Sequence, residues 1–133
     1  MASHFAADMV KNTGIRTIVF TDLALITALA NDFAFEEVYS KPLGWFMKRG
    51  DMLVAISSSG NSPNIVRAVE AAKKIGAMVV TLSAMKGDNA IRKVGELNFY
   101  VPAESYGLAE TAHAAILHYW MDLVEEEAGP LKE

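Results

Sequence analysis

The segment at residues 51–63, with the sequence DMLVAISSSGNSP, constrains the fold of this chain more than any other segment. Residues 52–56 form a short, continuous apolar run, which is typical of a strand that is buried on both faces of a parallel sheet. A Gly-Asn pair then favours a sharp turn. Ser62 suits a helix N-cap and Pro63 suits the first helical position, so the segment predicts a strand, a turn and a helix in succession.

The predicted turn carries four serine hydroxyls within six residues and leads directly into the helix. An apolar stripe that ends at Gly76 supports a helix over residues 63–75. The free N–H groups and the positive dipole end of such a helix attract an anion, and the hydroxyls add donors. We call residues 57–62 the serine loop and interpret it as a phosphate-binding site; the alternative is that serine and glycine only fill a tight turn. The hydroxyls belong to Ser57, Ser58, Ser59 and Ser62.

Length and composition indicate a single domain. The chain has 133 residues, which is close to the commonest domain length. No apolar run reaches the ~20 residues that span a bilayer, and the N-terminus has no signal-peptide pattern, so we expect a cytoplasmic protein. The absence of cysteine excludes thiolate metal sites and leaves His, Asp and Glu as possible ligands. The net charge of −4 disfavours nucleic acid or an anionic membrane as a partner.

Strand-like and helix-like segments alternate along the chain. This pattern predicts a doubly wound α/β fold with a mostly parallel sheet of about four strands, whose ligands bind at the carboxyl ends of the strands. Pro42 should kink or split the helical segment in which it lies. Strands are expected at residues 15–20, 52–56, 78–82 and 97–101. Helices are expected at residues 2–12, 22–30, 33–48, 63–75, 89–94 and 106–126.

Four segments, which together span nearly the whole chain, carry a family resemblance. Residues 3–8, with the sequence SHFAAD, are similar to a helical His-Phe-Ala-x-Glu segment, and residues 21–32 are similar to an aspartate-rich second segment. The serine loop and the last predicted helix are the other two. The order and spacing of these segments resemble the sugar isomerase (SIS) domain family, and most closely its phosphoheptose isomerase branch.

The resemblance implies an aldose–ketose isomerase that converts sedoheptulose 7-phosphate to a heptose 7-phosphate. The serine loop would hold the phosphate. Moving a carbonyl between C1 and C2 through an enediol requires a positioned base and acid, which a carboxylate and an imidazole supply at neutral pH. By the resemblance these groups are Asp8 and His118, while Asn31 and Asp32 bind sugar hydroxyls.

His4 and Asp8 stand four residues apart on a predicted helix, so their side chains share one face. They either chelate a divalent ion or form an ordinary surface pair. The resemblance implies zinc at this point, with no organic cofactor, and Glu110 and His118 would complete the ligand set. Eight helical residues separate the latter two by roughly 12 Å. One ion would therefore need a ligand from a second subunit or a distorted helix start, and the resemblance implies a homotetramer.

His113 is expected at a packed helix interface. Two positions depart from the family, because Asp8 stands where the family has glutamate and Glu110 where it usually has glutamine. The chain also begins inside the first motif, so we expect residues 1–133 to be one SIS domain that is truncated at its N-terminus and has little activity alone. The alternative function is a catalytically silent module that binds sugar phosphates.

Overall fold

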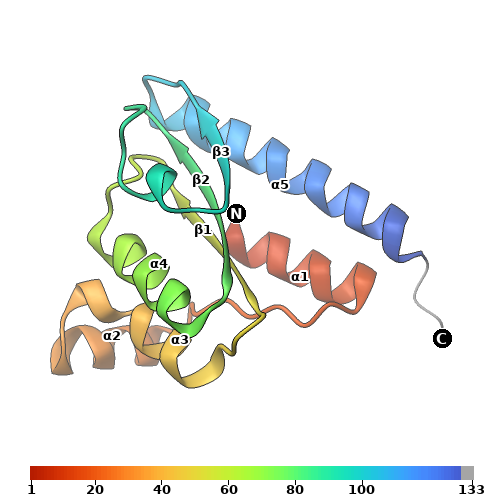
Figure 1. Ribbon diagram of the computed structural model, residues 1–133. Helices are drawn as coiled ribbons and strands as arrows, with labels where there is room; N and C mark the ends of the chain where they lie inside the picture. Colours follow the sequence, from red (N-terminus) through yellow and green to blue (C-terminus); the bar gives the residue numbers. More distant parts are fainter. Residues whose placement is uncertain (130–133) are drawn as a thin grey trace.

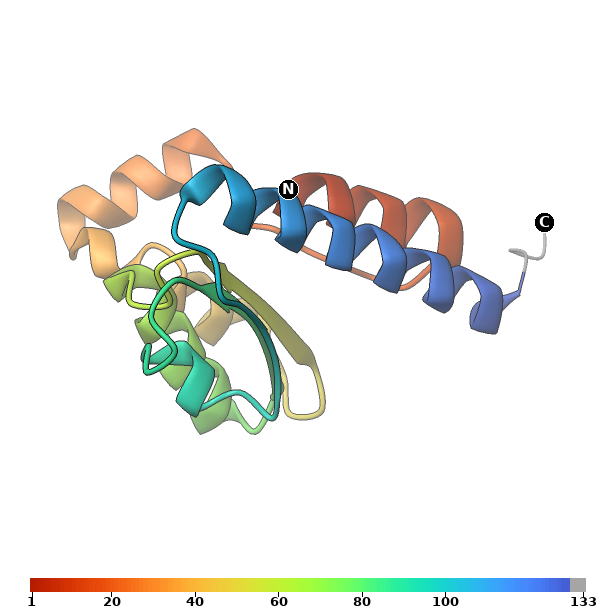
Figure 2. The same ribbon diagram turned by 90° about the horizontal axis from the view of Figure 1, so that it is seen from above.

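The computed structural model describes residues 1–129, which form three layers (Figures 1 and 2). The middle layer is a parallel sheet in the order β1-β2-β3. Helix α4 covers one face, and α1 and α5 lie side by side on the other. The strands are β1 (Met52–Ser57), β2 (Met78–Ala84) and β3 (Leu97–Val101). The helices are α1 (Ala2–Thr13), α2 (Leu23–Asp32), η1 (Phe35–Glu37), α3 (Ser40–Phe46), α4 (Pro63–Ile75), η2 (Ile91–Lys93) and α5 (Tyr106–Ala128).

The α/β class and the parallel sheet that the sequence predicts are confirmed. Helix α4 begins at the expected point, with Ser62 as its N-cap and Pro63 in its first turn. It ends at Gly76, which has a left-handed backbone with φ of 85° and donates its N–H to two carbonyls of the last helical turn. Within residues 1–129, no helix combines the length and the hydrophobicity that are needed to span a bilayer.

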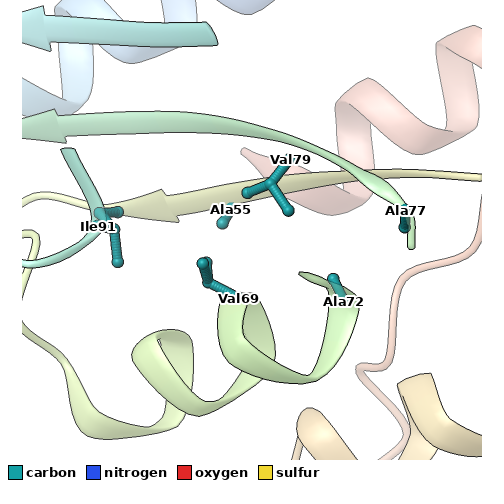
Figure 3. Packing of buried hydrophobic residues seen from close by; sticks show 6 residues of the cluster. All are labelled: Ala55, Val69, Ala72, Ala77, Val79 and Ile91. Atoms are coloured by element: carbon teal, nitrogen blue, oxygen red, sulfur yellow. The ribbon is translucent and has the colours of Figure 1, made fainter. Parts of the chain in front are cut away.

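Two apolar clusters fill the space on either side of the sheet. The first lies beneath α4, where Val69 is almost completely buried against Val79 of β2 (Figure 3). The second lies on the opposite face, where Val80 and Leu82 of β2 pack against Leu117 of α5. Successive residues of a strand point to opposite faces, so β2, buried on both sides, supplies both clusters. The full set of buried residues in the first cluster is Ala55, Val69, Ala72, Ala77, Val79 and Ile91.

The prediction of about four strands is wrong for the described residues, because the segment at residues 15–20 is not a strand. Its apolar, β-branched composition resembles that of a buried strand, yet Ile15 and Ile18 are 46% and 66% exposed. Composition favours a strand only where another strand supplies backbone partners. The sheet among residues 1–129 does not pair with this segment, which therefore stays an extended connection between α1 and α2.

Two predicted helices are shorter than expected. The segment at residues 33–48 is divided into η1 and α3, as the proline predicts, and Pro42 lies within the first turn of α3. Proline is tolerated there because the N–H groups of the first turn have no intrahelical partner. The segment at residues 89–94 forms only the single turn η2, because its backbone also bonds the serine loop: the Ile91 N–H donates to the Gly60 carbonyl.

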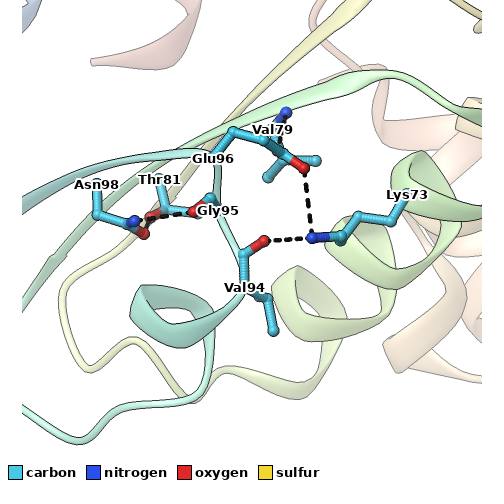
Figure 4. A network of polar contacts seen from close by, with 7 residues as sticks. All are labelled: Lys73, Val79, Thr81, Val94, Gly95, Glu96 and Asn98. Carbon is cyan, nitrogen blue, oxygen red and sulfur yellow. Dashed lines mark hydrogen bonds and ion pairs between the residues drawn. The ribbon is translucent and has the colours of Figure 1, made fainter.

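A polar network joins α4 to the start of β2 and β3 (Figure 4). The carboxylate of Glu96 accepts a hydrogen bond of 2.7 Å from the Val79 N–H and pairs with the Lys73 ammonium at 3.3 Å. Lys73 also donates to the Val94 carbonyl at 2.6 Å. Hydrogen bonds from the Val79 N–H and then from the Glu96 main chain, followed by the Lys73 ammonium, hold the pKa of Glu96 below its ordinary value.

Replacing Glu96 by glutamine tests this network. A carboxyl whose pKa is lowered by folding stabilises the folded state above its ordinary pKa and loses that effect as the pH falls through the lowered value. Glu96→Gln should therefore lower the melting temperature at pH 7, and the difference from wild type should shrink as the pH falls below about 4.3. Thermal unfolding at several pH values measures both effects. Glu70→Gln, which removes a carboxylate on the exposed face of α4, is the control; an equal difference at every pH would contradict the assignment.

Candidate functional site

The serine loop lies at the carboxyl end of β1, where the chain turns into α4. Ser57 is buried and in register with Ser83 of β2, so the carboxyl ends of the two strands meet beside the loop. The Ala84 N–H donates to the Ser58 carbonyl at 2.9 Å and continues this pairing into the loop. Parallel strands place all their carboxyl ends at one edge, so this is the edge at which α/β sheets bind their ligands.

The hydroxyls of the serine loop bond one another and the loop backbone. Ser57 donates to the Ser62 hydroxyl at 3.2 Å, and the Gly60 N–H donates to Ser57 Oγ at 3.1 Å. Ser59 Oγ accepts from the Asn61 N–H at 3.2 Å. Ser62 occupies the N-cap position of α4 as expected, but its hydroxyl makes no capping bond to the helix. The Ser62 hydroxyl is thus directed into the loop, and phosphate binding there stays a prediction.

Asn89 fixes the serine loop from the side. This asparagine is 1% exposed, and its Nδ2 donates to Ser83 Oγ at 3.1 Å and to the Lys86 carbonyl at 2.8 Å. Its side chain lies directly against Gly60, where an added Cβ would stand 2.0 Å from Asn89 Oδ1. Gly60 also has a φ of 66°, which disfavours any side chain. The loop therefore requires glycine for both backbone conformation and space.

A groove of about 340 Å³ lies along the contact between α1 and α5. All four residues that the resemblance assigns to catalysis and metal binding line it: His4, Asp8, Glu110 and His118. The two helices come from opposite ends of the chain and run side by side (Figure 2). Apolar contacts hold them at this spacing, including Phe5 of α1 against Trp120 of α5, whose ring centroids are 5.5 Å apart. The remaining residues of the groove are Met1, Phe5, Ala114, Leu117 and Met121.

Asp8 is the central polar group of this groove. One of its carboxylate oxygens lies 3.2 Å from His4 Nε2, and the other lies 3.6 Å from the Lys11 ammonium. The His4 ring packs edge-on against His118, with ring centroids 5.3 Å apart. The structure therefore brings a carboxylate and two imidazoles together from two helices, which is the set of groups that proton transfer requires.

The donor types in the groove suit a divalent ion, but their spacing in one chain does not. Two imidazoles and two carboxylates are common zinc ligands. However, no three His, Asp or Glu side chains in the described part of the chain lie close enough together to hold one ion. Helix α5 is continuous through Glu110 and His118, so it offers no distorted start that would bring these two side chains to one point. Lys11 also places a competing positive charge beside Asp8.

Asn31 and Asp32 lie at the end of α2, apart from the groove. Both side chains are exposed, and Asn31 Nδ2 donates to Asp32 Oδ1 at 2.8 Å. Helix α2 packs against η1, at the end of the molecule away from α1 (Figure 1). One copy of the chain does not bring these two residues to the groove, so their assignment to sugar binding stays a prediction.

Comparisons with known proteins test the family resemblance. The family model of the SIS domain matches residues 1–84, which is more than half of the chain. The chain belongs to the SIS domain family. Two curated relatives of this SIS domain are phosphoheptose isomerases. That of Thermodesulfovibrio yellowstonii is 35% identical over 131 residues, which cover 94% of this chain and 65% of the relative. That of Coxiella burnetii is 34% identical over 140 residues, which cover 99% and 70%.

A solved structure supports the same grouping. The SIS domain described here matches a phosphoheptose isomerase from Francisella tularensis with a TM-score of 0.87 and 26% identity. The match covers 94% of this chain and 68% of that one. The chain thus spans about two thirds of the length of the relatives that it matches.

The sequence does not predict the contact by which Asn89 supports the serine loop. Asn89 was expected only within a helical segment, and its Oδ1 does accept from the Arg92 N–H at 3.1 Å, as an asparagine before a helix often does. Asn89 and Gly60 are 29 positions apart, so no local sequence pattern predicts their contact.

The sequence predicts His113 at a packed helix interface, and the structure places it completely buried on α5.

Replacing Gly60 by alanine tests how the loop is held. A left-handed backbone costs an L-residue about 1–2 kcal/mol, and displacement of Asn89 adds to this cost. Gly60→Ala should therefore lower the free energy of unfolding by more than that amount in urea titrations. Gly44→Ala is the matched control, because Gly44 lies inside α3 with no atom within 4 Å of the added Cβ, and alanine should stabilise the helix by roughly 1 kcal/mol or less. Equal effects of the two changes would contradict this account.

Proposed function

We propose that this chain is an aldose–ketose isomerase that acts on a sugar phosphate, and that its substrate is sedoheptulose 7-phosphate. The observation that carries the proposal is the groove in which Asp8 of α1 and His118 of α5 lie on facing helices, next to His4. The likeness to phosphoheptose isomerases supports the substrate class. A carboxylate base and an imidazole acid are the groups that move a carbonyl through an enediol.

The two parts of the reaction are assigned to different elements. The serine loop and the start of α4 bind the phosphate, since their hydroxyls and N–H groups donate to an anion without adding a full charge. Asp8 removes a proton from C1 of the ketose while His118 donates a proton to the C2 oxygen, which gives the enediol. Asp8 then returns its proton to C2 and His118 takes the proton of the C1 hydroxyl, which gives the aldose and restores both groups. Asn31 and Asp32 bind sugar hydroxyls, which requires that a second copy of the chain bring α2 to the groove.

A direct assay tests the activity. This chain, and any longer form that its gene encodes, is incubated with sedoheptulose 7-phosphate with and without zinc, and formation of the aldose is followed. Turnover by either form supports the isomerase. The absence of turnover by both forms, together with measurable binding of the sugar phosphate, would contradict it and favour a catalytically silent binding module.

Substitutions in the groove separate chemistry from phosphate binding. Asp8→Asn and His118→Ala should each lower kcat by about 100-fold or more, because each removes a proton-transfer group. Binding of inorganic phosphate, measured by calorimetry, should change little, since the serine loop is intact. Asp122→Asn removes a carboxylate from α5 outside the groove and should leave kcat unchanged. Wild-type turnover in Asp8→Asn would refute its role as the base.

We also propose that the chain works as a homo-oligomer, the tetramer that the family resemblance implies. Six large apolar side chains around α2 and α3 are more than half exposed, and Tyr106, Leu108 and Tyr119 of α5 are exposed to a similar extent. Exposed apolar surface of this kind marks protein interfaces. Light scattering on a size-exclusion column should give a multiple of the chain mass, and Leu23→Glu should reduce it, whereas Glu70→Lys on α4 should not. A single-chain mass at all concentrations would contradict the proposal. The six residues around α2 and α3 that are more than half exposed are Ile18, Leu23, Phe33, Phe35, Trp45 and Phe46.

Zinc binding is a proposal that depends on this oligomer. His4 contacts both Asp8 and His118, but no three such side chains in the described residues lie close enough to hold one ion. Glu110 precedes His118 by about two helical turns on α5. A second copy of the chain would have to supply the ligand that one copy does not bring to the same point. The proton-transfer roles of Asp8 and His118 are assigned without the ion.

A further inference from the structure

His113 is a buried polar side chain that the proposed chemistry does not use. It has no exposed surface, and its Nε2 stands 3.1 Å from the main-chain oxygen of Ser83. Because a carbonyl oxygen only accepts, Nε2 carries the hydrogen of this bond. Nδ1 has no hydrogen-bond partner among the described residues. An apolar side chain would avoid this buried, unpaired nitrogen, so packing alone does not account for a histidine here.

The bond to Ser83 connects α5 to the serine loop. Ser83 is the last residue of β2 in register with β1, and it lies opposite Ser57, the first residue of the loop. Its hydroxyl accepts from Asn89 Nδ2 at 3.1 Å, and the Asn89 side chain fills the space beside Gly60. A continuous path of buried contacts therefore runs from α5 through the end of β2 to the backbone of the serine loop.

The same helix carries two of the four groove residues that the resemblance assigns to catalysis and metal binding. Glu110 lies about one turn before His113 on α5, and His118 about one and a half turns after it. The neighbouring contacts of α5 with the sheet are apolar, through Ala109 and Leu117. Apolar packing is not directional, so it resists separation of the layers better than a shift of the helix along its axis. A hydrogen bond has a fixed length and angle, so the bond from His113 resists such a shift.

We propose that His113 is a positioning residue for the isomerase: through its bond to the Ser83 carbonyl it fixes where α5 lies relative to the serine loop. The distance between the bound phosphate and the proton-transfer group His118 depends on that position. This role rests on the proposed function, and it assigns to His113 no contact with the substrate.

Two substitutions separate the hydrogen bond from the bulk of the ring. His113→Leu keeps an apolar side chain of similar size but removes the N–H, whereas the amide of His113→Gln can still donate to the Ser83 carbonyl. In the form of the protein that turns over sugar phosphate, His113→Leu should lower kcat by up to about 100-fold, since a misplacement of roughly 1 Å can cost that much. His113→Gln should restore most of kcat. KM and the binding of inorganic phosphate should change much less than kcat, because the substitution removes no hydroxyl or N–H group of the loop.

Val69→Ala is the control for a purely structural effect. It removes buried side-chain atoms beneath α4, on the opposite face of the sheet, and should lower stability without lowering kcat at temperatures where the protein is folded. The proposal is overturned if His113→Leu retains the kcat of wild type, or if His113→Gln is as impaired as His113→Leu.

An NMR measurement tests the connection between α5 and the serine loop without an assay of isomerase activity. If the wild-type protein does not isomerise sugar phosphates, the proposed function fails, but the connection can still be measured by NMR. His113→Leu should shift the backbone amide resonances of Gly60 and Asn61, and His113→Gln should shift them less, since both residues lie at the far end of the path. Unchanged amide resonances of the serine loop in His113→Leu would show that α5 and the loop are not connected through this histidine.

Discussion

The contact between Gly60 and Asn89 is the constraint on which the candidate site depends. The backbone of the serine loop passes so close to the buried asparagine that no side chain fits between them. Asn89 is held in turn by the Ser83 hydroxyl and by the main-chain carbonyls of Ala84, the last residue of β2, and Lys86. Because buried polar groups without partners are costly, these bonds fix the asparagine, and the asparagine fixes the loop. The start of α4, where an anion would bind, is set by this arrangement.

Helix α5 is the element that relates this loop to the groove. Ala109, Leu117 and Trp120 of α5 pack on the sheet, and α1 lies beside the helix (Figure 2). A single rigid helix thus contacts both the support of the serine loop and the groove with Asp8 and His118. Rigid elements hold functional groups more accurately than loops do. This division assigns anion binding to a strand-to-helix turn and proton transfer to two facing helices.

The exposed apolar side chains around α2 connect oligomerisation with the sugar-binding and metal-binding proposals. Residues 15–22 and α2 pack against the domain mainly through η1 and α3, for example through Phe20 on Phe46. Their remaining apolar surface is covered by no other segment of residues 1–129, since Leu23 is 72% exposed. A second copy of the chain that covers this surface would also change the surroundings of Asn31 and Asp32. Oligomerisation, sugar binding and the completion of a metal site are therefore linked in the proposed function.

The sequence by itself determined the elements that depend on local patterns. Continuous apolar runs gave β1, β2 and β3, and the N-cap, proline and glycine signals gave both ends of α4, because such preferences act within a few residues. The resemblance also selected His4, Asp8, Glu110 and His118, which line one groove. Only the tertiary structure decided that residues 15–20 are not a strand, since a strand needs a partner that local sequence does not specify. It also decided that Asn89 closes on Gly60 and His113 on Ser83, because these contacts join segments about 30 positions apart and leave no periodic pattern in the chain.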